Sequence, residues 1–173
     1  TGPMLRQRAT PIEPKATADD LHDELAELGA ELLVETLDAL ESGDVEPTPQ
    51  NEDAATYAPL MSKQDGEVDW SESARRVSDL IRGVNPWPGA FSYLDRTDDR
   101  IKFHLADVCE ADSLNLDVDG AEPGTVLRAD GELLIACGED AVRVLDVQAP
   151  GRRAMAADDF LNGYDIEVGD RFR

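Results

Sequence analysis

A leucine-rich segment near the start of the chain is the strongest constraint on its fold. Leucines recur at helical spacing between residues 17 and 41, which predicts a long helix with one apolar face. Thr17 suits the N-cap, and Gly43 supplies the stop. Upstream lies only a short predicted strand, Met4 to Arg8. One strand and one helix cannot form a core, so the leucine face needs a partner. That partner is either the second half of the chain or the remainder of the helix's own domain.

A polar, proline-bearing stretch at residues 44–59 follows this helix and has the composition of a linker. Beyond it we expect a second helix from Ser71 to Gly83, a rigid Asn-Pro-Trp-Pro-Gly-Ala loop, and a last short helix at residues 156–161. Between the loop and the last helix, five strands are predicted at residues 91–94, 101–108, 125–128, 133–137 and 141–147, with turn signals at 96–99, 119–120, 130–131 and 138–140. The chain is therefore of mixed α and β class, and the strands favour a small closed barrel of the OB type.

Composition excludes several classes of function. The net charge is -22, which argues against a generally basic nucleic-acid binder and against attraction to an anionic membrane. No run approaches the roughly 18 apolar residues of a membrane span. Cys109 and Cys137 lie in strand-like apolar runs, which favours buried small side chains over nucleophiles and a reducing, cytoplasmic setting.

Catalytic groupings are absent from the sequence. His22 and His104 are about eighty residues apart, with no spacing that fits metal ligation. The sequence also contains no glycine-rich phosphate loop and no nucleophile elbow. Taken from its residues alone, the chain resembles a non-catalytic module.

Basic residues are concentrated in the second part of the chain, where 13 of the 16 Lys and Arg lie between residues 57 and 173. Several cluster locally: Arg75-Arg76, Arg82, Lys102 and Arg152-Arg153. On one barrel face these cations could bind phosphates, because the attraction between a cation and a phosphate in contact outweighs the screened repulsion from distant acids. The alternative is that they form surface salt bridges with the plentiful acids.

Three stretches, in order, resemble the methionyl-tRNA formyltransferase family. They are residues 21–33 (LHDELAELGAELL), 81–90 (IRGVNPWPGA) and 150–163 (PGRRAMAADDFLNG), and shorter matches occur at residues 56–59 and 66–71. The loop at 85–90 also occurs in sister formyltransferases that act on sugar nucleotides or folate. The closing stretch fits the tRNA enzyme best.

The resemblance implies a two-domain, monomeric cytoplasmic enzyme that transfers a formyl group from 10-formyltetrahydrofolate to the amino group of methionyl initiator tRNA. By this match, residues 1–43 are the last strand and helix of a Rossmann-like catalytic domain, 44–69 the linker and 70–173 the OB-like domain. The resemblance implies no metal and no membrane partner. The family's catalytic Asn, His and Asp are expected upstream of Thr1, and the folate site outside this chain. We therefore expect no catalytic residue here and no activity from this chain alone.

Basic positions of the family carry over as expected tRNA contacts: Lys63, Arg82, Lys102, Arg152 and Arg153. A further family lysine is replaced by Leu60, which weakens the linker contact. Trp87 is expected to be a packing residue of its loop rather than a base-stacking platform, and Trp70 to anchor the second helix.

Two other functions remain open. The chain could be a free-standing OB-like module that binds RNA or a protein, or part of a sister formyltransferase with a sugar-nucleotide substrate. Salt-dependent tRNA binding that falls when Arg152 and Arg153 are replaced separates the tRNA enzyme from the sister enzyme.

The acidic composition leads to a prediction about salt. Asp exceeds Glu (23 against 15) and Lys is scarce (3 against 13 Arg), a pattern that suggests adaptation to high internal salt. Self-repulsion at low ionic strength should then destabilise the protein. Thermal melts across a salt series should show a melting temperature that rises with added salt; a flat series would rule the idea out.

Overall fold

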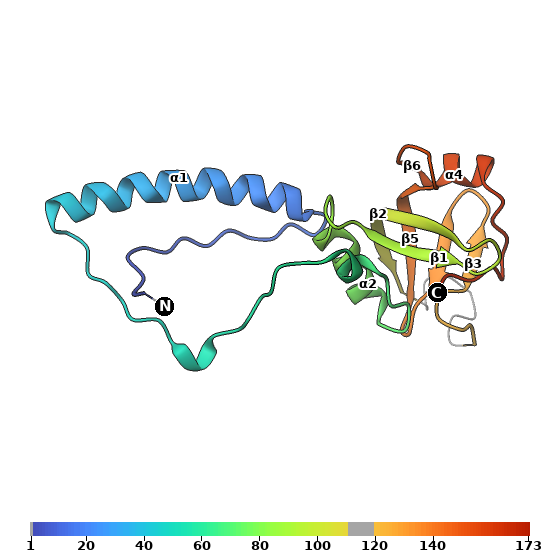
Figure 1. Ribbon diagram of the computed structural model, residues 1–173, viewed down its shortest axis with the longest axis horizontal. Coiled ribbons are helices and arrows are strands. Elements are labelled where there is room, and N and C mark those ends of the chain that lie inside the picture. The colour runs from blue at the N-terminus through green and yellow to red at the C-terminus, as the bar shows by residue number, and fades with distance from the viewer. Residues whose placement is uncertain (1, 111–119) are drawn as a thin grey trace. The chain divides into compact units, whose positions relative to one another are not determined.

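The computed structural model describes residues 2–110 and 120–173 and divides the chain into two compact units. Unit 1 is Thr1–Leu60 and unit 2 is Met61–Arg173, and Figure 1 follows the chain through both. The division falls inside the segment expected to be a linker, residues 44–69. The assignment of residues 1–43 to a catalytic domain stays a prediction.

Unit 1 contains one long helix, α1 (Ala18–Ser42), and its N-terminus has a capping box. The Thr17 hydroxyl accepts from the Asp20 backbone N–H at 3.2 Å, and the Asp20 carboxylate accepts from the Thr17 N–H at 2.9 Å. Gly43 ends the helix with a left-handed φ of 79°. The helix predicted from the leucine spacing is confirmed, with both of its caps.

The leucine face of α1 is not buried within unit 1. Ala39 is the one buried residue of this helix. The exposed apolar side chains, with 47 to 59% of their surface accessible, are Leu25, Leu33, Val34, Leu37 and Leu40. Unit 1 by itself therefore does not supply the partner that the sequence pattern requires.

The prediction of a strand at Met4–Arg8 is wrong. Met4 alone pairs, through an antiparallel bridge in which Met4 and Thr48 exchange backbone hydrogen bonds of 2.7 and 2.8 Å. The described part of unit 1 contains no strand beside this segment, so its other backbone groups have no ladder to join. The remaining regular element of the unit is a short 3-10 helix, η1 (Glu52–Ala54).

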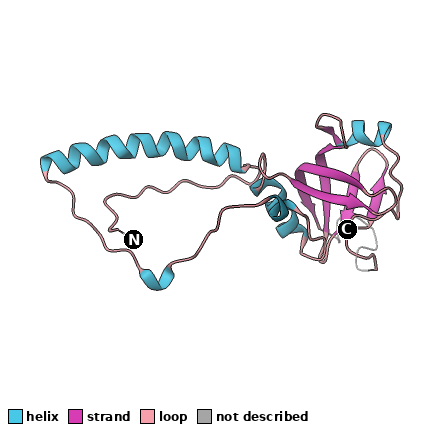
Figure 2. Cartoon of the chain, viewed as in Figure 1, coloured by secondary structure: helices cyan, strands magenta, loops and turns pink. Residues whose placement is uncertain are grey.

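Unit 2 is built on one sheet, which is antiparallel throughout its described pairings (Figure 2). Its order is β1-β2-β5-β4-β3, with β6 paired to β5. The strands are β1 (Ala90–Leu94), β2 (Asp99–Cys109), β3 (Val126–Ala129), β4 (Leu133–Ala136), β5 (Ala141–Gln148) and β6 (Met155–Ala156). The five longer strands confirm the sequence prediction to within two residues at each end.

The last residues of the chain join the two edges of this sheet. Phe172 bridges to Leu94 at the β1 edge, and Arg171 bridges to Thr125 beside β3. Arg173 and Tyr93 exchange backbone hydrogen bonds of 2.9 and 3.2 Å. The C-terminal segment thus closes the sheet into the barrel that the strand pattern predicts.

Two helices pack at opposite ends of the sheet (Figure 1). α2 (Ala74–Gly83) lies against β2, where the Ser78 hydroxyl donates to the Ala106 carbonyl at 2.8 Å. α4 (Ala157–Gly163) contacts β5 and β6. The second helix begins three residues later than predicted, because Ser71 donates to the Asp69 carboxylate in a turn and Ser73 caps the helix.

An aromatic cluster fills the core of unit 2. The ring of Phe103 lies 5.4 Å from that of Trp70 and 5.5 Å from that of Phe172, measured between centroids. Trp70 is 4% exposed, and its indole N–H donates to the Ser92 hydroxyl at 2.9 Å. Ser92 in turn donates to the Arg173 carbonyl, so the polar atoms of this buried pair are satisfied. Trp70 therefore anchors the barrel core rather than only the second helix.

The turns follow the sequence signals where they lie in described residues. Asp98 and Asp140 adopt left-handed φ angles of 60° and 63°, and Gly131 one of 67°. Each ends or begins a hairpin where the sequence predicted a turn. The signal at residues 119–120 is not tested in full, because Asp119 lies outside the described residues.

A glycine beside the core gives a test of the barrel closure. At Gly124, with φ of 88°, an added Cβ would lie 2.1 Å from the Phe172 carbonyl oxygen. At Gly131, also left-handed, a Cβ would have nothing within 4 Å. Gly124→Ala should cost about 1–3 kcal/mol of unfolding free energy beyond Gly131→Ala, which shares the backbone strain but not the clash. Urea unfolding measures both; equal losses would contradict the closure.

Candidate nucleic-acid interface

The cations of unit 2 divide into paired and unpaired groups. Eight arginines contact at least one carboxylate: Arg75, Arg76, Arg82, Arg96, Arg128, Arg143, Arg171 and Arg173. Within residues 61–110 and 120–173, five cations have no carboxylate partner: Lys63, Arg100, Lys102, Arg152 and Arg153. Four of these five are among the tRNA contacts expected from the sequence.

Lys102 lies on the outer face of the β1–β2 hairpin. Ile101 and Phe103 point into the core, so the alternating positions Arg100, Lys102 and His104 share the opposite face. The Arg100 guanidinium lies over the Phe91 ring, 4.4 Å from its centroid. This strand therefore presents two cations and a histidine in a row.

The turn after β5 carries Arg152 and Arg153. Gln148, which is paired with Lys102 across the β2–β5 ladder, donates from its side chain to the Arg152 carbonyl at 2.7 Å. A backbone hydrogen bond of 3.1 Å from Arg152 to Ala149 tightens the same turn. Gln148 thus ties the exposed arginine turn to the strand that carries Lys102.

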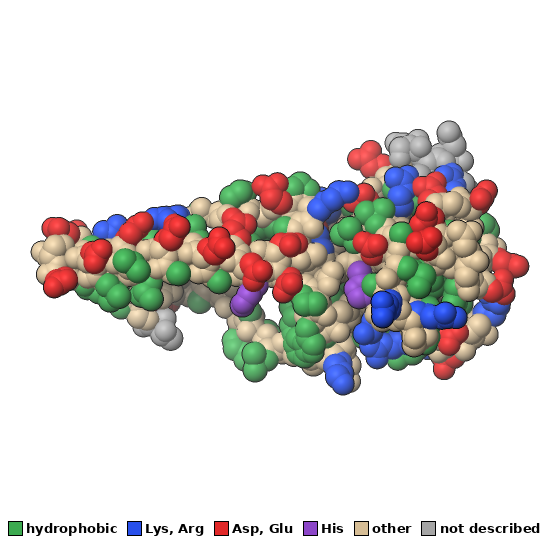
Figure 3. Space-filling model, turned by 90° about the horizontal axis from the view of Figure 1, so that it is seen from above, with side chains coloured by type: hydrophobic (Ala, Val, Ile, Leu, Met, Phe, Trp, Pro, Cys, Tyr) green, Lys and Arg blue, Asp and Glu red, His purple; other side chains and the backbone are tan. Residues whose placement is uncertain are grey.

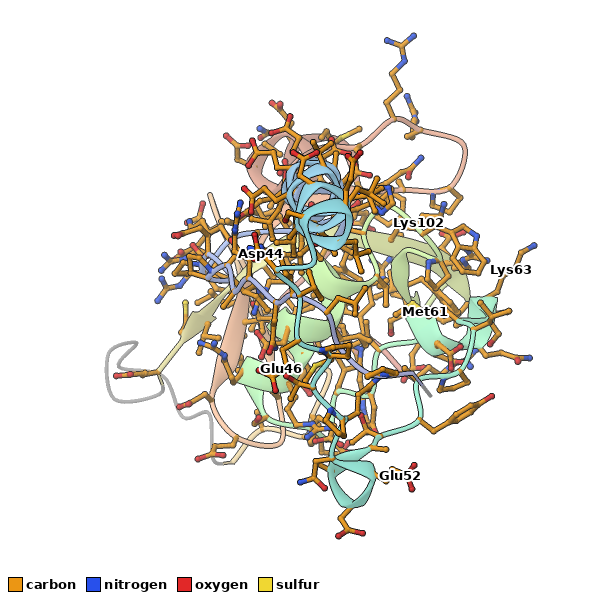
Figure 4. All side chains as sticks on the ribbon, turned by 90° about the vertical axis from the view of Figure 1, so that its left-hand side faces the viewer. Asp44, Glu46, Glu52, Met61, Lys63 and Lys102 are labelled. Atoms are coloured by element: carbon orange, nitrogen blue, oxygen red, sulfur yellow. The ribbon has the colours of Figure 1, made fainter. Side chains whose placement is uncertain are left out.

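Lys63 belongs to a 3-10 helix, η2 (Lys63–Gly66), that runs into the β1 edge. Just beyond it, Val68 donates its backbone N–H to the Phe91 carbonyl at 2.9 Å, and Phe91 pairs with Lys102 on its other side. Figure 4 shows Lys63 and Lys102 on the same side of the unit. Figure 3 shows several Lys and Arg side chains close together on the visible face of unit 2, which also carries acidic side chains, whereas acidic side chains predominate on the visible surface of α1.

Arg82 differs from the other expected contacts. It lies on α2, its side chain is 17% exposed, and its guanidinium donates to the Asp79 carboxylate at 2.8 Å. Burial by itself would raise the pKa of Asp79, but hydrogen bonds from Arg82 and Arg75 outweigh this and lower it. A phosphate would have to compete with Asp79 for Arg82.

A cavity of about 480 Å³ adjoins the arginine turn. It is lined by Asp99, Ala149, Pro150, Arg152, Met155, Phe160, Gly163 and Tyr164. The Tyr164 hydroxyl donates to the Asp99 carboxylate. Burial, helped by the nearby carboxylate, raises the pKa of Tyr164 to about 12, and the same hydrogen bond lowers the pKa of Asp99.

The described residues were also compared with what a metal centre and a reactive thiol require. No group of three or more His, Cys, Asp or Glu within them could hold a metal ion. Cys109 and Cys137 are free and buried, as predicted, and burial raises the pKa of the Cys137 thiol to about 12. That shift favours the unreactive thiol over the thiolate. No helix in the described part of the chain is long and apolar enough to span a bilayer.

Arg100 was not among the expected contacts, and the environment expected for Trp87 is wrong. Arg100 precedes Lys102 by two residues, and the strand period already places them on one face. Trp87 was expected to pack, but 58% of its surface is exposed. No sequence signal distinguishes it from the buried Trp70, because only the folded loop decides which way the indole points.

Comparison with known proteins identifies the family. The model of the formyl transferase C-terminal domain matches residues 60–165. The chain belongs to this formyltransferase family. The methionyl-tRNA formyltransferases of Caldanaerobacter subterraneus and Aromatoleum aromaticum are each 41% identical to it, over 98% and 99% of this chain. The chain spans about half of their length, 52% in both cases.

Solved structures share the fold. HypX from Aquifex aeolicus, crystallised in complex with tetrahydrofolic acid, aligns with a TM-score of 0.60 and 22% identity over 96% of this chain and 30% of HypX. A variant of the same protein aligns with a TM-score of 0.61. At this identity the likeness is one of fold, and it agrees with the mixed α and β class that the sequence predicts for this formyltransferase chain.

The Tyr164–Asp99 pair beside the arginine turn gives a pH prediction. Because the folded state raises the phenol pKa, its contribution to stability is complete below the unfolded value of about 10 and is lost as the pH rises toward 12. Tyrosinate absorbance should show one tyrosine that titrates near pH 12 and is missing in Tyr164→Phe. A titration in which Tyr164→Phe removes a step near pH 10 instead would contradict the assignment.

Proposed function

We propose that this chain is part of a methionyl-tRNA formyltransferase and that its barrel unit holds the tRNA. The whole protein would transfer a formyl group from 10-formyltetrahydrofolate to the amino group of methionyl initiator tRNA in the cytoplasm. One observation carries the proposal: in a chain of net charge -22, the tRNA contacts expected from the family include four of the five unpaired cations in the described part of unit 2.

Unpaired cations are suited to phosphate binding for an energetic reason. An arginine already bound to a carboxylate must give up that partner, whereas Arg152 and Arg153 need only release water. Each cation that neutralises a phosphate also releases a condensed counterion, which favours binding at low salt. Salt screens carboxylates that lie more than about 10 Å from a cation, so distant acids weaken these contacts little.

The five expected contacts differ in what they offer a nucleic acid. Lys102 and the Arg152–Arg153 turn share Gln148 as a common support, so their spacing is fixed by the β2–β5 ladder. Lys63 extends this surface across β1. Arg82, with Asp79 as partner, would make the weakest contribution. Such contacts position the tRNA and carry no base specificity of their own.

We assign the catalytic steps of formyl transfer to other parts of the whole protein. The catalytic Asn, His and Asp and the folate site implied by the family have no counterpart that we assign in this chain. We propose that these 173 residues bind initiator tRNA but do not formylate it. The barrel would contribute uniform binding of the tRNA, and the acceleration of formyl transfer would come from groups that touch the reacting amine.

Binding of initiator tRNA across a salt series tests the proposal. Replacing both Arg152 and Arg153 by Gln should weaken binding and reduce the slope of log affinity against log salt by about 2, one phosphate contact for each arginine.

The matched control replaces Arg171 and Arg173 by Gln. These two arginines are also exposed, but each already contacts carboxylates. We expect their slope to stay within about 0.5 of the unmodified protein. Equal slopes for the two double variants, or no binding of tRNA by the unmodified chain, would overturn the proposal.

A further inference from the structure

Trp87 is an exposed aromatic side chain that the fold does not use. It exposes 58% of its surface, whereas Trp70, the other tryptophan, exposes 4% and lies in the core. Tryptophan carries a large apolar area whose burial would stabilise the protein, so its exposure leaves a broad flat surface available for contact.

The loop that carries Trp87 is held in place on two sides by contacts with backbone atoms of neighbouring elements. The Asn85 side chain donates to the His104 carbonyl on β2 at 2.9 Å. On the other side Gly66 of η2 packs so closely that an added Cβ would lie 2.3 Å from the Gly89 carbonyl oxygen. A further backbone hydrogen bond of 2.9 Å, from Gly89 to Val84, closes the loop. The exposed indole is therefore carried on a loop whose backbone is held against both η2 and β2.

The two elements beside this loop each carry an unpaired lysine. η2 bears Lys63 and β2 bears Lys102, and neither contacts a carboxylate within the described residues. The nearest acid in η2, Asp65, is engaged as the cap of that helix, where its carboxylate accepts from the Ser62 backbone. An exposed indole on a loop whose two neighbouring elements each carry an unpaired cation suits a nucleotide, because a base can stack on the ring and phosphates can bind the lysines.

We propose that Trp87 is a stacking platform for an unpaired base of RNA, with Lys63 and Lys102 bound to the flanking phosphates. The inference rests on the proposed function and deepens it by naming single-stranded nucleotides as what this side of the barrel binds. A tRNA offers such nucleotides in its loops and at its 3′ end. The contact is tolerant of sequence, because every base has a π-face.

Tryptophan fluorescence tests the proposal directly, because the chain has two tryptophans and one of them is buried. An eight-nucleotide oligoadenylate should quench the emission of the unmodified 173-residue chain. In Trp87→Phe, where Trp70 alone emits, the quenching should disappear. An RNA duplex of the same length should quench far less at equal phosphate concentration, since its bases are already stacked.

Affinity measurements provide the matched comparison. Trp87→Ala should weaken oligoadenylate binding about 10-fold, and Trp87→Phe, which keeps an aromatic face, less than 3-fold. Lys63→Gln and Lys102→Gln should each reduce the salt slope by about 0.7, the value for one contact to a single strand. Because Trp87 is exposed, its replacement should leave the urea midpoint unchanged, which separates loss of contact from loss of fold.

The outcomes distinguish this inference from the proposed function. If initiator tRNA binds with a slope that depends on Arg152 and Arg153, but Trp87→Ala binds oligoadenylate within 2-fold of the unmodified chain, the stacking platform is overturned and the proposed function stands. Quenching that persists in Trp87→Phe also overturns it. If the unmodified chain binds neither tRNA nor oligoadenylate, both proposals fail.

Discussion

The closure of the barrel around the Trp70–Phe103–Phe172 cluster is the constraint on which unit 2 depends. The indole N–H of Trp70 reaches the Ser92 hydroxyl, which in turn donates to the Arg173 carbonyl. One hydrogen-bonded chain thus connects the segment that leads into α2, the middle of β1 and the last residue of the sequence. Burial of each aromatic ring contributes about 1.5–3 kcal/mol, and it requires that the C-terminal segment lie between the two sheet edges.

This closure also determines where the charges lie. Once the sheet curls, one face of β1 and β2 points inward and the other outward, so the exposed Arg100 and the half-buried Lys102 and His104 come to share the outer face. Carboxylates form ion pairs with most of the remaining arginines. Arg173, in the C-terminal segment that closes the barrel, contacts Asp95 and Asp98. Exposed pairs of this kind contribute little to stability. Their consequence is that the cations left over mark a surface with a distinct chemistry.

Much of the fold follows from local patterns in the sequence, and the exceptions have physical causes. The α1 caps at Thr17 and Gly43 are local, so they could be predicted. The Met4–Arg8 strand could not be excluded in this way, because a strand exists only if another strand pairs with it. The same holds for Trp87: the two tryptophans of the chain have opposite burial, and this depends on how each segment packs in the folded chain.

The candidate site, too, could be predicted only in part from the sequence. Its members Lys63, Lys102, Arg152 and Arg153 were identified through motifs, and the sequence left open whether they formed salt bridges. By itself the sequence determined the helix caps, the strand periodicity, the turns and the family resemblance, since each depends on residues close together along the chain. The tertiary structure decided which cations find carboxylates, which tryptophan is buried and how the last residues close the barrel. These depend on which distant segments meet, and a one-dimensional pattern does not specify that.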